Sequence, residues 1–204
     1  MSDCRDPLDH EPWEFLMISY RFGHFLDGPM SPLARKIEIN PNVLTVMGFV
    51  ITTVAALVIP HNIRIGGILI LLGGICDMLD GVFARVNGRA TSFGAFHDSL
   101  LDRYSESFIF LSIAWHLAGR GDQGAAVLSI GTMVGALLVS YARARGEGLG
   151  IDTHEGLMER PERIILLIFA TLTGWLVPVL WILFLLTHAT VIQRTLVVWK
   201  AKES

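Results

Sequence analysis

Residues 77–102, DMLDGVFARVNGRATSFGAFHDSLLD, interrupt a chain that is otherwise strongly hydrophobic, and they contain four aspartates, two arginines and three glycines. Asp77 and Asp80 are three residues apart, so on a helix they share one face. Asp98 and Asp102 are four residues apart and share a face of a second helix. If the two helices run antiparallel, the four carboxylates come together. This stretch therefore predicts a pair of helices with an acidic site between them.

The energetic cost of such a cluster indicates what it binds. Each aspartate in the middle of a membrane-spanning helix costs about 2.5–3.5 kcal/mol, and neighbouring carboxylates also repel one another. Divalent cations remove both problems, and Mg²⁺ or Mn²⁺ suits carboxylate ligands. An alternative is that the aspartates are solvated at the membrane interface or paired with Arg85, Arg89 and Arg103. That alternative does not require the matched glycines and spacings, so we expect the metal site.

The stretch also carries a family resemblance. It fits the pattern D-x2-D-G-x2-A-R-x8-G-x3-D-x3-D at every position, and so resembles the CDP-alcohol phosphatidyltransferase family. The eight specified positions are Asp77, Asp80, Gly81, Ala84, Arg85, Gly94, Asp98 and Asp102. The resemblance covers most of the chain, from Asn40 to Arg194. A chance match of eight fixed residues is very improbable, so this signal is specific.

The resemblance implies a reaction in which an acceptor hydroxyl attacks the lipid-linked phosphorus of a CDP-linked lipid and CMP leaves. It implies two Mg²⁺ or Mn²⁺ ions held by Asp77, Asp80, Asp98 and Asp102. Asp98 and Asp102 are the expected catalytic residues, and Asp102 is the candidate general base for the acceptor hydroxyl. The expected CDP-binding residues are Asp77, Gly81, Ala84, Arg85, Gly94, Asn42 and Thr45.

A second stretch, residues 141–163, is basic and reads YARARGEGLGIDTHEGLMERPER. Guanidinium groups match phosphate oxygens with two hydrogen bonds, so the arginines here are candidates for binding a phosphorylated acceptor. The candidates are Arg143, Arg145, Arg160 and Arg163, with Arg194 completing the group. The alternative is that these arginines are positively charged membrane flanks and form salt bridges with Glu147, Glu159 and Glu162.

Within the family, the basic stretch resembles the phosphatidylinositol phosphate and archaetidylinositol phosphate synthases. These enzymes carry S-Y-x-[KR]-A-R-A-E-G followed by E-R-x-[ED]-R, and the chain departs by having Arg143 where lysine is frequent and Gly146 where alanine is common. The resemblance implies inositol 1-phosphate as acceptor. Phosphatidylglycerophosphate synthases usually read D-P-x-x-D-K at the last aspartates, whereas this chain reads DSLLDR from Asp98, which disfavours that branch. Glycerol phosphate or serine as acceptor, and a water-soluble CDP-inositol donor, stay open.

Composition sets the class of protein. With 204 residues, 52% of them hydrophobic, and a mean hydropathy of +0.52, the chain is expected to be a single all-α integral membrane domain. A net charge of −3 argues against a nucleic-acid binder. Two cysteines provide no disulfide framework. We divide the chain into an N-terminal tail with an interfacial amphipathic helix (1–39) and a six-helix transmembrane domain (40–204). A helix packed on the protein is the alternative for the interfacial segment.

The apolar runs predict six spanning helices. Residues 164–193 carry no formal charge, and thirty helical residues would measure about 45 Å, too long for one crossing. A turn at Thr173–Pro178 therefore divides this run. Gly131 and Gly135, four residues apart, indicate close helix packing. The expected helices cover residues 43–60, 65–86, 92–117, 124–142, 160–175 and 178–200.

The distribution of basic residues predicts the topology. One side carries most of the arginines and lysines, whereas the other carries only Arg64 and Arg120. The positive-inside rule then places both termini and the aspartates at the cytoplasmic face of the cell membrane. The family resemblance further suggests a homodimer.

A cation-coupled transporter is the rival hypothesis from a different class of protein, because it would also use carboxylates within the membrane. Transporters typically distribute acidic residues over several helices and often contain a repeated half. Here the aspartates cluster at one end of two adjacent helices, and no repeat is evident. The enzyme is therefore the preferred hypothesis.

Overall fold

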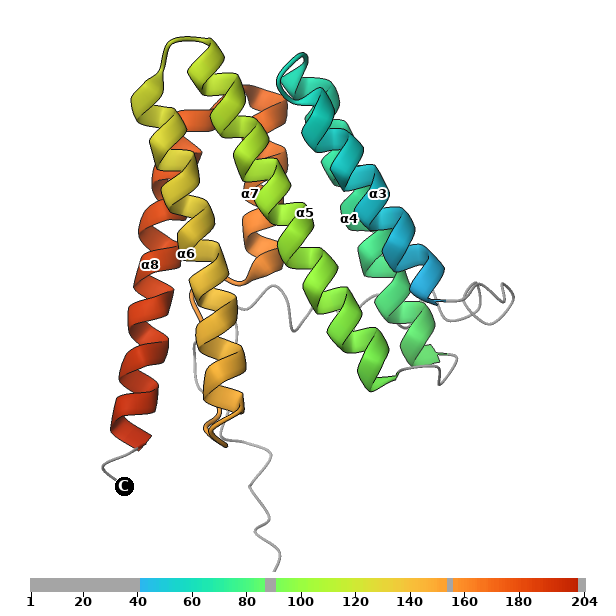
Figure 1. Ribbon diagram of the computed structural model, residues 1–204, viewed down its shortest axis with the longest axis vertical. Coiled ribbons are helices and arrows are strands. Elements are labelled where there is room, and N and C mark those ends of the chain that lie inside the picture. The colour runs from blue at the N-terminus through green and yellow to red at the C-terminus, as the bar shows by residue number, and fades with distance from the viewer. Residues whose placement is uncertain (1–40, 87–90, 154–155, 202–204) are drawn as a thin grey trace, which may run out of the picture.

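The computed structural model describes residues 41–86, 91–153 and 156–201, which form six α-helices and no strand (Figure 1). The helices are α3 (Pro41–Val58), α4 (Ile63–Val86), α5 (Ser92–Gly119), α6 (Gln123–Glu147), α7 (Arg160–Thr173) and α8 (Leu176–Ala201). The all-α class and the six helices of the domain are confirmed, with bounds a few residues from those predicted. The N-terminal tail and interfacial helix lie outside the described residues.

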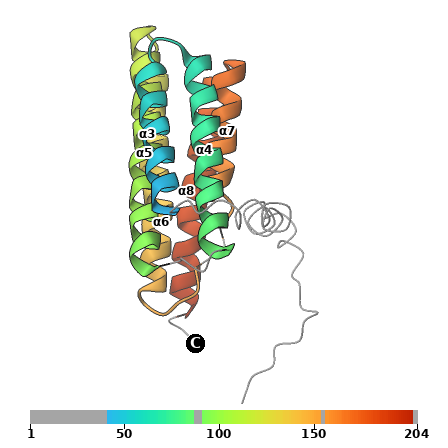
Figure 2. The ribbon, with the colours of Figure 1, turned by 90° about the vertical axis from the view of Figure 1, so that its right-hand side faces the viewer.

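The six helices pack in a ring. Each has its closest contacts with two neighbours, in the order α3, α4, α7, α8, α6, α5 and back to α3. Consecutive helices run antiparallel, as Figures 1 and 2 show. The C-terminal half of α4, the N-terminal half of α5 and the start of α7 therefore lie toward the same end of the molecule. The described residues of both charged stretches lie toward that end.

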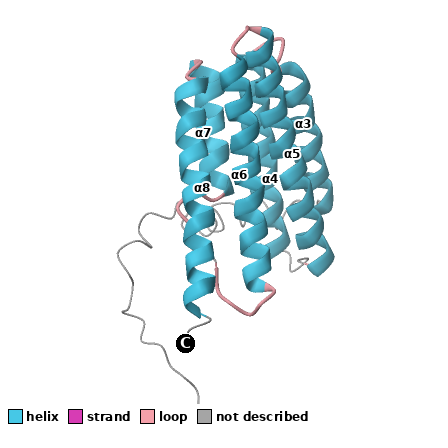
Figure 3. Cartoon of the chain, turned by 60° about the vertical axis from the view of Figure 1, so that its left-hand side comes forward, coloured by secondary structure: helices cyan, strands magenta, loops and turns pink. Residues whose placement is uncertain are grey.

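Local sequence signals explain where the helices begin and end (Figure 3). The Thr91 hydroxyl accepts a hydrogen bond from the Gly94 N–H at 3.0 Å and caps α5, and Asp122 caps α6 in the same way. α7 ends at Gly174, whose φ of +84° is accessible to glycine at little cost. The predicted break in the charge-free run is therefore confirmed. It is shorter than expected, because α8 already begins at Leu176.

The contact between α6 and α8 depends on small residues. A Cβ atom added at Gly135 would lie 2.4 Å from Oγ1 of Thr187, so the two helices approach too closely for a larger side chain. Gly131 lies against Phe184 in the same way. The predicted packing role of this glycine pair agrees with the contact that the structure forms.

By length and composition, three of the described helices could cross a membrane: Ile63–Phe83 of α4, α6 and α8. Val43–Val58 is a shorter apolar helix. α7 has 14 residues and would measure about 21 Å, less than the thickness of a bilayer core. The ring thus combines long apolar helices with a short helix that begins beside the charged residues.

Candidate active site

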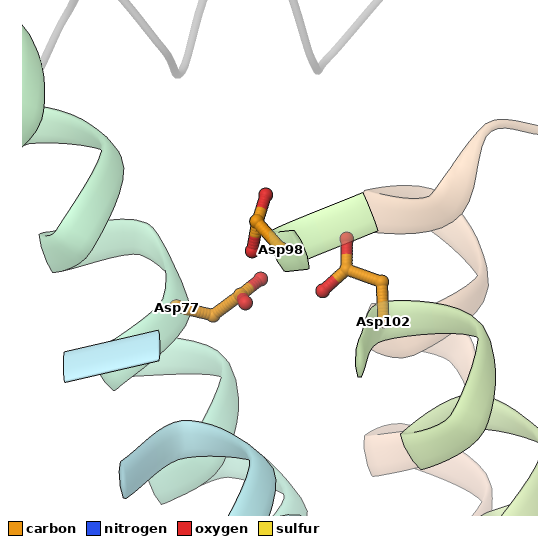
Figure 4. A group of neighbouring side chains, drawn as sticks. All are labelled: Asp77, Asp98 and Asp102. Carbon is orange, nitrogen blue, oxygen red and sulfur yellow. The ribbon is translucent and has the colours of Figure 1, made fainter. Parts of the chain in front are cut away.

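Three aspartates converge between α4 and α5. One carboxylate oxygen each from Asp77, Asp98 and Asp102 lies within 4.8 Å of the other two. Figure 4 shows the Asp77 side chain reaching from α4 toward Asp98 and Asp102 on α5. Because α4 and α5 run antiparallel on either side of a short connection and both pack against α3, side chains 21 or more positions apart in sequence come together. The spacing and separation of these oxygens suit a shared divalent cation.

Asp80, the fourth aspartate of the sequence pattern, lies outside this group of three. It is buried, with 7% of its surface exposed, and its carboxyl group is hydrogen-bonded to the Thr45 side chain of α3. Oδ2 of Asp80 and Oδ1 of Asp98 are buried and have no hydrogen-bond partner among the described residues. Buried carboxylate oxygens without partners are costly, so these two atoms fit ligands of a cation. On this observation, the donor set present fits Mg²⁺ or Mn²⁺.

A cavity of about 460 Å³ leads away from the aspartates. Its polar end is formed by Thr45, Asp77, Asp102 and Arg160, and the remainder is largely apolar. The apolar lining comes from α3, α4, α5 and α7 and includes Phe49, Ile70, Leu71, Ile75, Ile164, Ile165 and Ile168. Some of these side chains are also exposed at the surface, so the cavity opens between α4 and α7. The site is therefore an acidic pocket joined to an apolar one.

Arg160 is the arginine of the basic stretch that reaches the aspartates. It is the first residue of α7, and its guanidinium group bridges α4 and α5. Nη1 donates to Oδ2 of Asp77 at 2.5 Å, and Nη2 lies 2.8 Å from Oδ1 of Asp102. The guanidinium group thus neutralises two carboxylates that a divalent cation would also neutralise.

The other candidate arginines of the described residues do not converge on the aspartates. Arg163 forms a buried ion pair with Glu106, and Arg194 donates to the Val139 carbonyl oxygen at 2.7 Å and to Oε1 of Glu159 at 3.3 Å. The remaining two, Arg143 and Arg145, lie near the end of α6. Arg143 pairs with Glu147 at 2.9 Å, and Arg145 is exposed. The group that the sequence placed together is therefore divided among several partners.

The other predicted CDP-binding residues lie along α3, α4 and α5. Gly81 follows Asp80 in α4, and Gly94 lies in the first turn of α5, where its N–H is bound by Thr91. The side chains of Asn42, Ala84 and Arg85 are outside the part that the structure describes. Backbone placement puts all of these positions at the end of the molecule that carries the aspartates.

Glu106 is a residue that the sequence reasoning missed. Its side chain is 6% exposed and accepts two hydrogen bonds from Arg163, at 2.6 and 2.8 Å. A signal was present, because Glu106 follows Asp102 by four residues and therefore shares its helix face. An acidic residue at this position in an apolar helix needs a partner, and the sequence alone did not show which arginine supplies it.

Comparison with known proteins agrees with this geometry. The CDP-alcohol phosphatidyltransferase family matches residues 38–199. The chain is 37% identical to the phosphatidylinositol phosphate synthase of Corynebacterium glutamicum, over 85% of this chain and 84% of that protein. It is 34% identical to the archaetidylinositol phosphate synthase of Methanothermobacter thermautotrophicus, over 84% of this chain and 89% of that protein.

Solved structures show the same fold. The crystal structure of the phosphatidylinositol phosphate synthase of Mycobacterium tuberculosis with CDP-DAG bound has a TM-score of 0.77 and 29% identity, covering 83% of this chain and 93% of that one. The same enzyme in complex with manganese and citrate has a TM-score of 0.76 and 28% identity, covering 85% and 88%. Together with the aspartate cluster, these matches show that the chain is an enzyme belonging to the CDP-alcohol phosphatidyltransferase family.

Proposed function

We propose that the protein transfers a phosphatidyl-type group from a CDP-linked lipid, CDP-diacylglycerol or CDP-archaeol, to inositol 1-phosphate and releases CMP, in phospholipid biosynthesis. The observation that carries this proposal is the group of three carboxylates, with oxygens within 4.8 Å of one another, at the polar end of an apolar cavity. The donor needs both parts, because a nucleotide diphosphate is highly charged and its lipid chains are not.

The shape of the cavity supports a lipid-linked donor. The apolar walls from α4 and α7 continue to the outer surface, where Leu71, Ile75 and Ile165 are 41%, 40% and 50% exposed. A lipid chain in this opening would cover apolar surface while its phosphates remain beside Asp77 and Asp102. The relative solved with CDP-DAG bound supports the same donor class.

Asp77, Asp80, Asp98 and Asp102 would hold the cations, and we propose two ions of Mg²⁺ or Mn²⁺. Such ions, when bound, polarise a pyrophosphate and neutralise the charge that develops on the leaving group. The buried oxygens of Asp80 and Asp98 that have no hydrogen-bond partner within residues 41–86, 91–153 and 156–201 support this assignment, as does the manganese in the solved relative.

The chain's own residues supply the remaining chemistry. Asp102 accepts the proton from the acceptor hydroxyl, whose oxygen forms the new bond to the lipid-linked phosphorus while the bond from that phosphorus to CMP breaks. Asp98, four residues away on the same helix, lies beside it. Gly81 and Gly94, with Thr45, Asn42, Ala84 and Arg85, bind the cytidine and phosphates, because small residues admit the nucleotide and cations hold phosphate.

The acceptor phosphate is assigned to Arg143, Arg145, Arg160, Arg163 and Arg194. Arg160 has the strongest support, because it lines the cavity and already contacts two aspartates. The guanidinium groups of Arg163 and Arg194 are buried against protein groups, so in this arrangement they stabilise the packing around the start of α7. The names of the two relatives, both inositol phosphate lipid synthases, support inositol 1-phosphate.

We propose that the six helices span the membrane, and the exposed apolar surface supports a membrane protein. Exposed apolar side chains cover the outer faces of α3, α4, α6 and α8, and exposed tryptophans occur near both ends of the bundle, at Trp115, Trp175 and Trp199. Trp115 and Trp175 lie near the end opposite the aspartates. We place the aspartate end, with both termini, at the cytoplasmic side of the cell membrane, because the basic residues gather there. We further propose a homodimer.

A panel of radiolabelled acceptors tests the proposal. The purified protein in detergent is given CDP-diacylglycerol, Mn²⁺ or Mg²⁺, and inositol 1-phosphate, inositol, glycerol 3-phosphate or serine, and lipid product and CMP are measured. We expect product with inositol 1-phosphate, and only when the divalent cation is present. If lipid product forms only with glycerol 3-phosphate, then glycerol 3-phosphate and not inositol 1-phosphate is the acceptor. Absence of CMP formation with every acceptor would refute the proposed donor reaction.

A further inference from the structure

Two arginines of α7 meet two acidic residues of α5. Arg160 and Arg163 are three residues apart, and Asp102 and Glu106 are four apart, so each pair of residues follows one helix face. The outer pair, Arg160–Asp102, lies at the aspartate cluster, with N···O of 2.8 Å. The inner pair, Arg163–Glu106, lies one helical turn further from it.

The inner pair is buried and complete. The side chains of Arg163 and Glu106 are 1% and 6% exposed, and two parallel hydrogen bonds of 2.6 and 2.8 Å join them. A third N–H of Arg163 donates to the Met158 carbonyl oxygen at 3.2 Å, in the segment that leads into α7. Bidentate pairing of this kind fixes the direction as well as the distance between the two helices.

The outer pair, by contrast, shares its carboxylates with the candidate cation site. Arg160 pairs with Asp77 and Asp102, which both belong to the group suited to a cation, so a cation bound there would compete with the guanidinium group. The side chains of Arg160 and Asp102 are also more exposed, at 28% and 12%. The inner pair lies outside the cation site and can persist while the outer pair opens.

Apart from the contacts of Arg160, the described polar attachments at the α7 N-terminus lead to α8 and to α6, where Nη1 of Arg143 lies 3.8 Å from Oε1 of Glu159. The Met158 N–H donates to Thr190, and Glu159 meets Arg194, and both of these partners lie on α8. α8 carries none of the four aspartates, whereas α5 carries Asp98 and Asp102. Of the two pairs that join α7 to α5, the inner pair is therefore the one that can keep the first turn of α7 in place relative to α5 when Arg160 moves.

We propose that Glu106 is a positioning residue, which holds the first turn of α7 against α5 through Arg163 and thereby keeps Arg160 within reach of the aspartate cluster. The proposal rests on the proposed use of Arg160 in the reaction and does not depend on which alcohol is the acceptor.

A double-mutant cycle between Glu106→Gln and Arg160→Ala tests this role. kcat and KM for both substrates are measured for the full chain in detergent, with the acceptor that the panel selects, beside thermal unfolding. If Glu106 acts through Arg160, each single variant lowers kcat/KM by about tenfold or more, and the double variant is within about twofold of Arg160→Ala. The matched control is Ser129→Ala, because the buried Ser129 hydroxyl donates to the Phe110 carbonyl oxygen, also on α5. In the double variant of Ser129→Ala and Arg160→Ala, the loss of kcat/KM should equal the product of the two single losses.

The proposal would be overturned if the loss of kcat/KM in the double variant equals the product of the losses in Glu106→Gln and Arg160→Ala. It would also be overturned if Glu106→Gln has the same kcat and KM as the unmodified protein. If Glu106→Gln does not fold, Glu106→Asp enters the same cycle, since it keeps the charge on a shorter side chain. If Arg160→Ala turns over normally, both the proposed role of Arg160 and the inference are wrong. Turnover with an acceptor other than inositol 1-phosphate would refute only the proposed acceptor, because the cycle is then measured with that alcohol.

Discussion

The aspartate cluster and the basic stretch are both rich in charge, but their charges are satisfied differently. Carboxylate oxygens of Asp77, Asp98 and Asp102 gather within 4.8 Å, and buried oxygens of Asp80 and Asp98 lack a hydrogen-bond partner among the described residues. Most of the arginines already have protein partners, as Arg163 has Glu106. One region is thus arranged to receive a ligand, and much of the other maintains the fold. A cluster of charge in a sequence can mean either.

The largest effect expected is on turnover. Asp98→Asn and Asp102→Asn remove a charge from the cluster, and Asp102→Asn also removes the proposed proton acceptor, so CMP release should fall by at least about a hundredfold. The measurement is CMP formation by folded protein in detergent. Asp122→Asn is the matched control, because this helix cap is remote from the cluster and asparagine caps equally well. Near-normal turnover in either cluster variant would remove that aspartate from the mechanism.

The second prediction concerns stability and tests the basic stretch. Arg163→Ala leaves the Glu106 carboxylate buried without its partner, which should lower the free energy of unfolding by about 3–5 kcal/mol. Arg145→Ala removes an exposed arginine and should change it by less than about 0.5 kcal/mol. Denaturant titration in detergent measures both. Equal stabilities, with a raised KM for the acceptor in Arg163→Ala, would instead favour the proposed role of Arg163 in binding the acceptor phosphate over a role in stability.

A third prediction tests whether the segment before α7 is a fixed scaffold. A Cβ atom at Gly146 would lie 2.5 Å from Cγ2 and Oγ1 of Thr153, and Thr153 in turn donates to the Arg143 carbonyl oxygen. Gly146→Ala should therefore lower the free energy of unfolding by about 1–3 kcal/mol. Gly119→Ala, where a Cβ atom meets nothing within 4 Å, is the control. A neutral Gly146→Ala would show that this segment adjusts readily.

The smallest expected effect concerns Arg160, which joins the two regions within the part of the chain that the structure describes. Arg160→Ala removes the guanidinium group that competes for Asp77 and Asp102, so Mn²⁺ should bind more tightly. We expect the dissociation constant to fall about fivefold, which corresponds to about 1 kcal/mol. Calorimetry without substrates measures it, with Arg145→Ala as the unaffected control. Weaker Mn²⁺ binding would show that Arg160 supports the cation site instead of competing for it.

The fold and the acidic site were largely predictable because they depend on local regularities. The three- and four-residue spacings of the aspartates identify a helix face, and the antiparallel connection follows from the short interval between Asp80 and Asp98. Gly174 divides a charge-free run that is too long for one crossing. The family pattern, at eight positions, identifies the same residues independently. Each of these signals lies within a few turns of one helix or one connection.

The sequence by itself therefore determined the helices, the acidic site and the enzyme family. Only the tertiary structure decided how the arginines are used, because that depends on which helices become neighbours in the ring. Arg163 meets Glu106 across 57 residues, and Arg160 meets Asp77 across 83. Helical periodicity gives the face on which a side chain lies and not the helix that this face will meet. Packing of α7 between α4 and α8 selects these partners, so Arg160 reaches the site while Arg163 becomes part of its support.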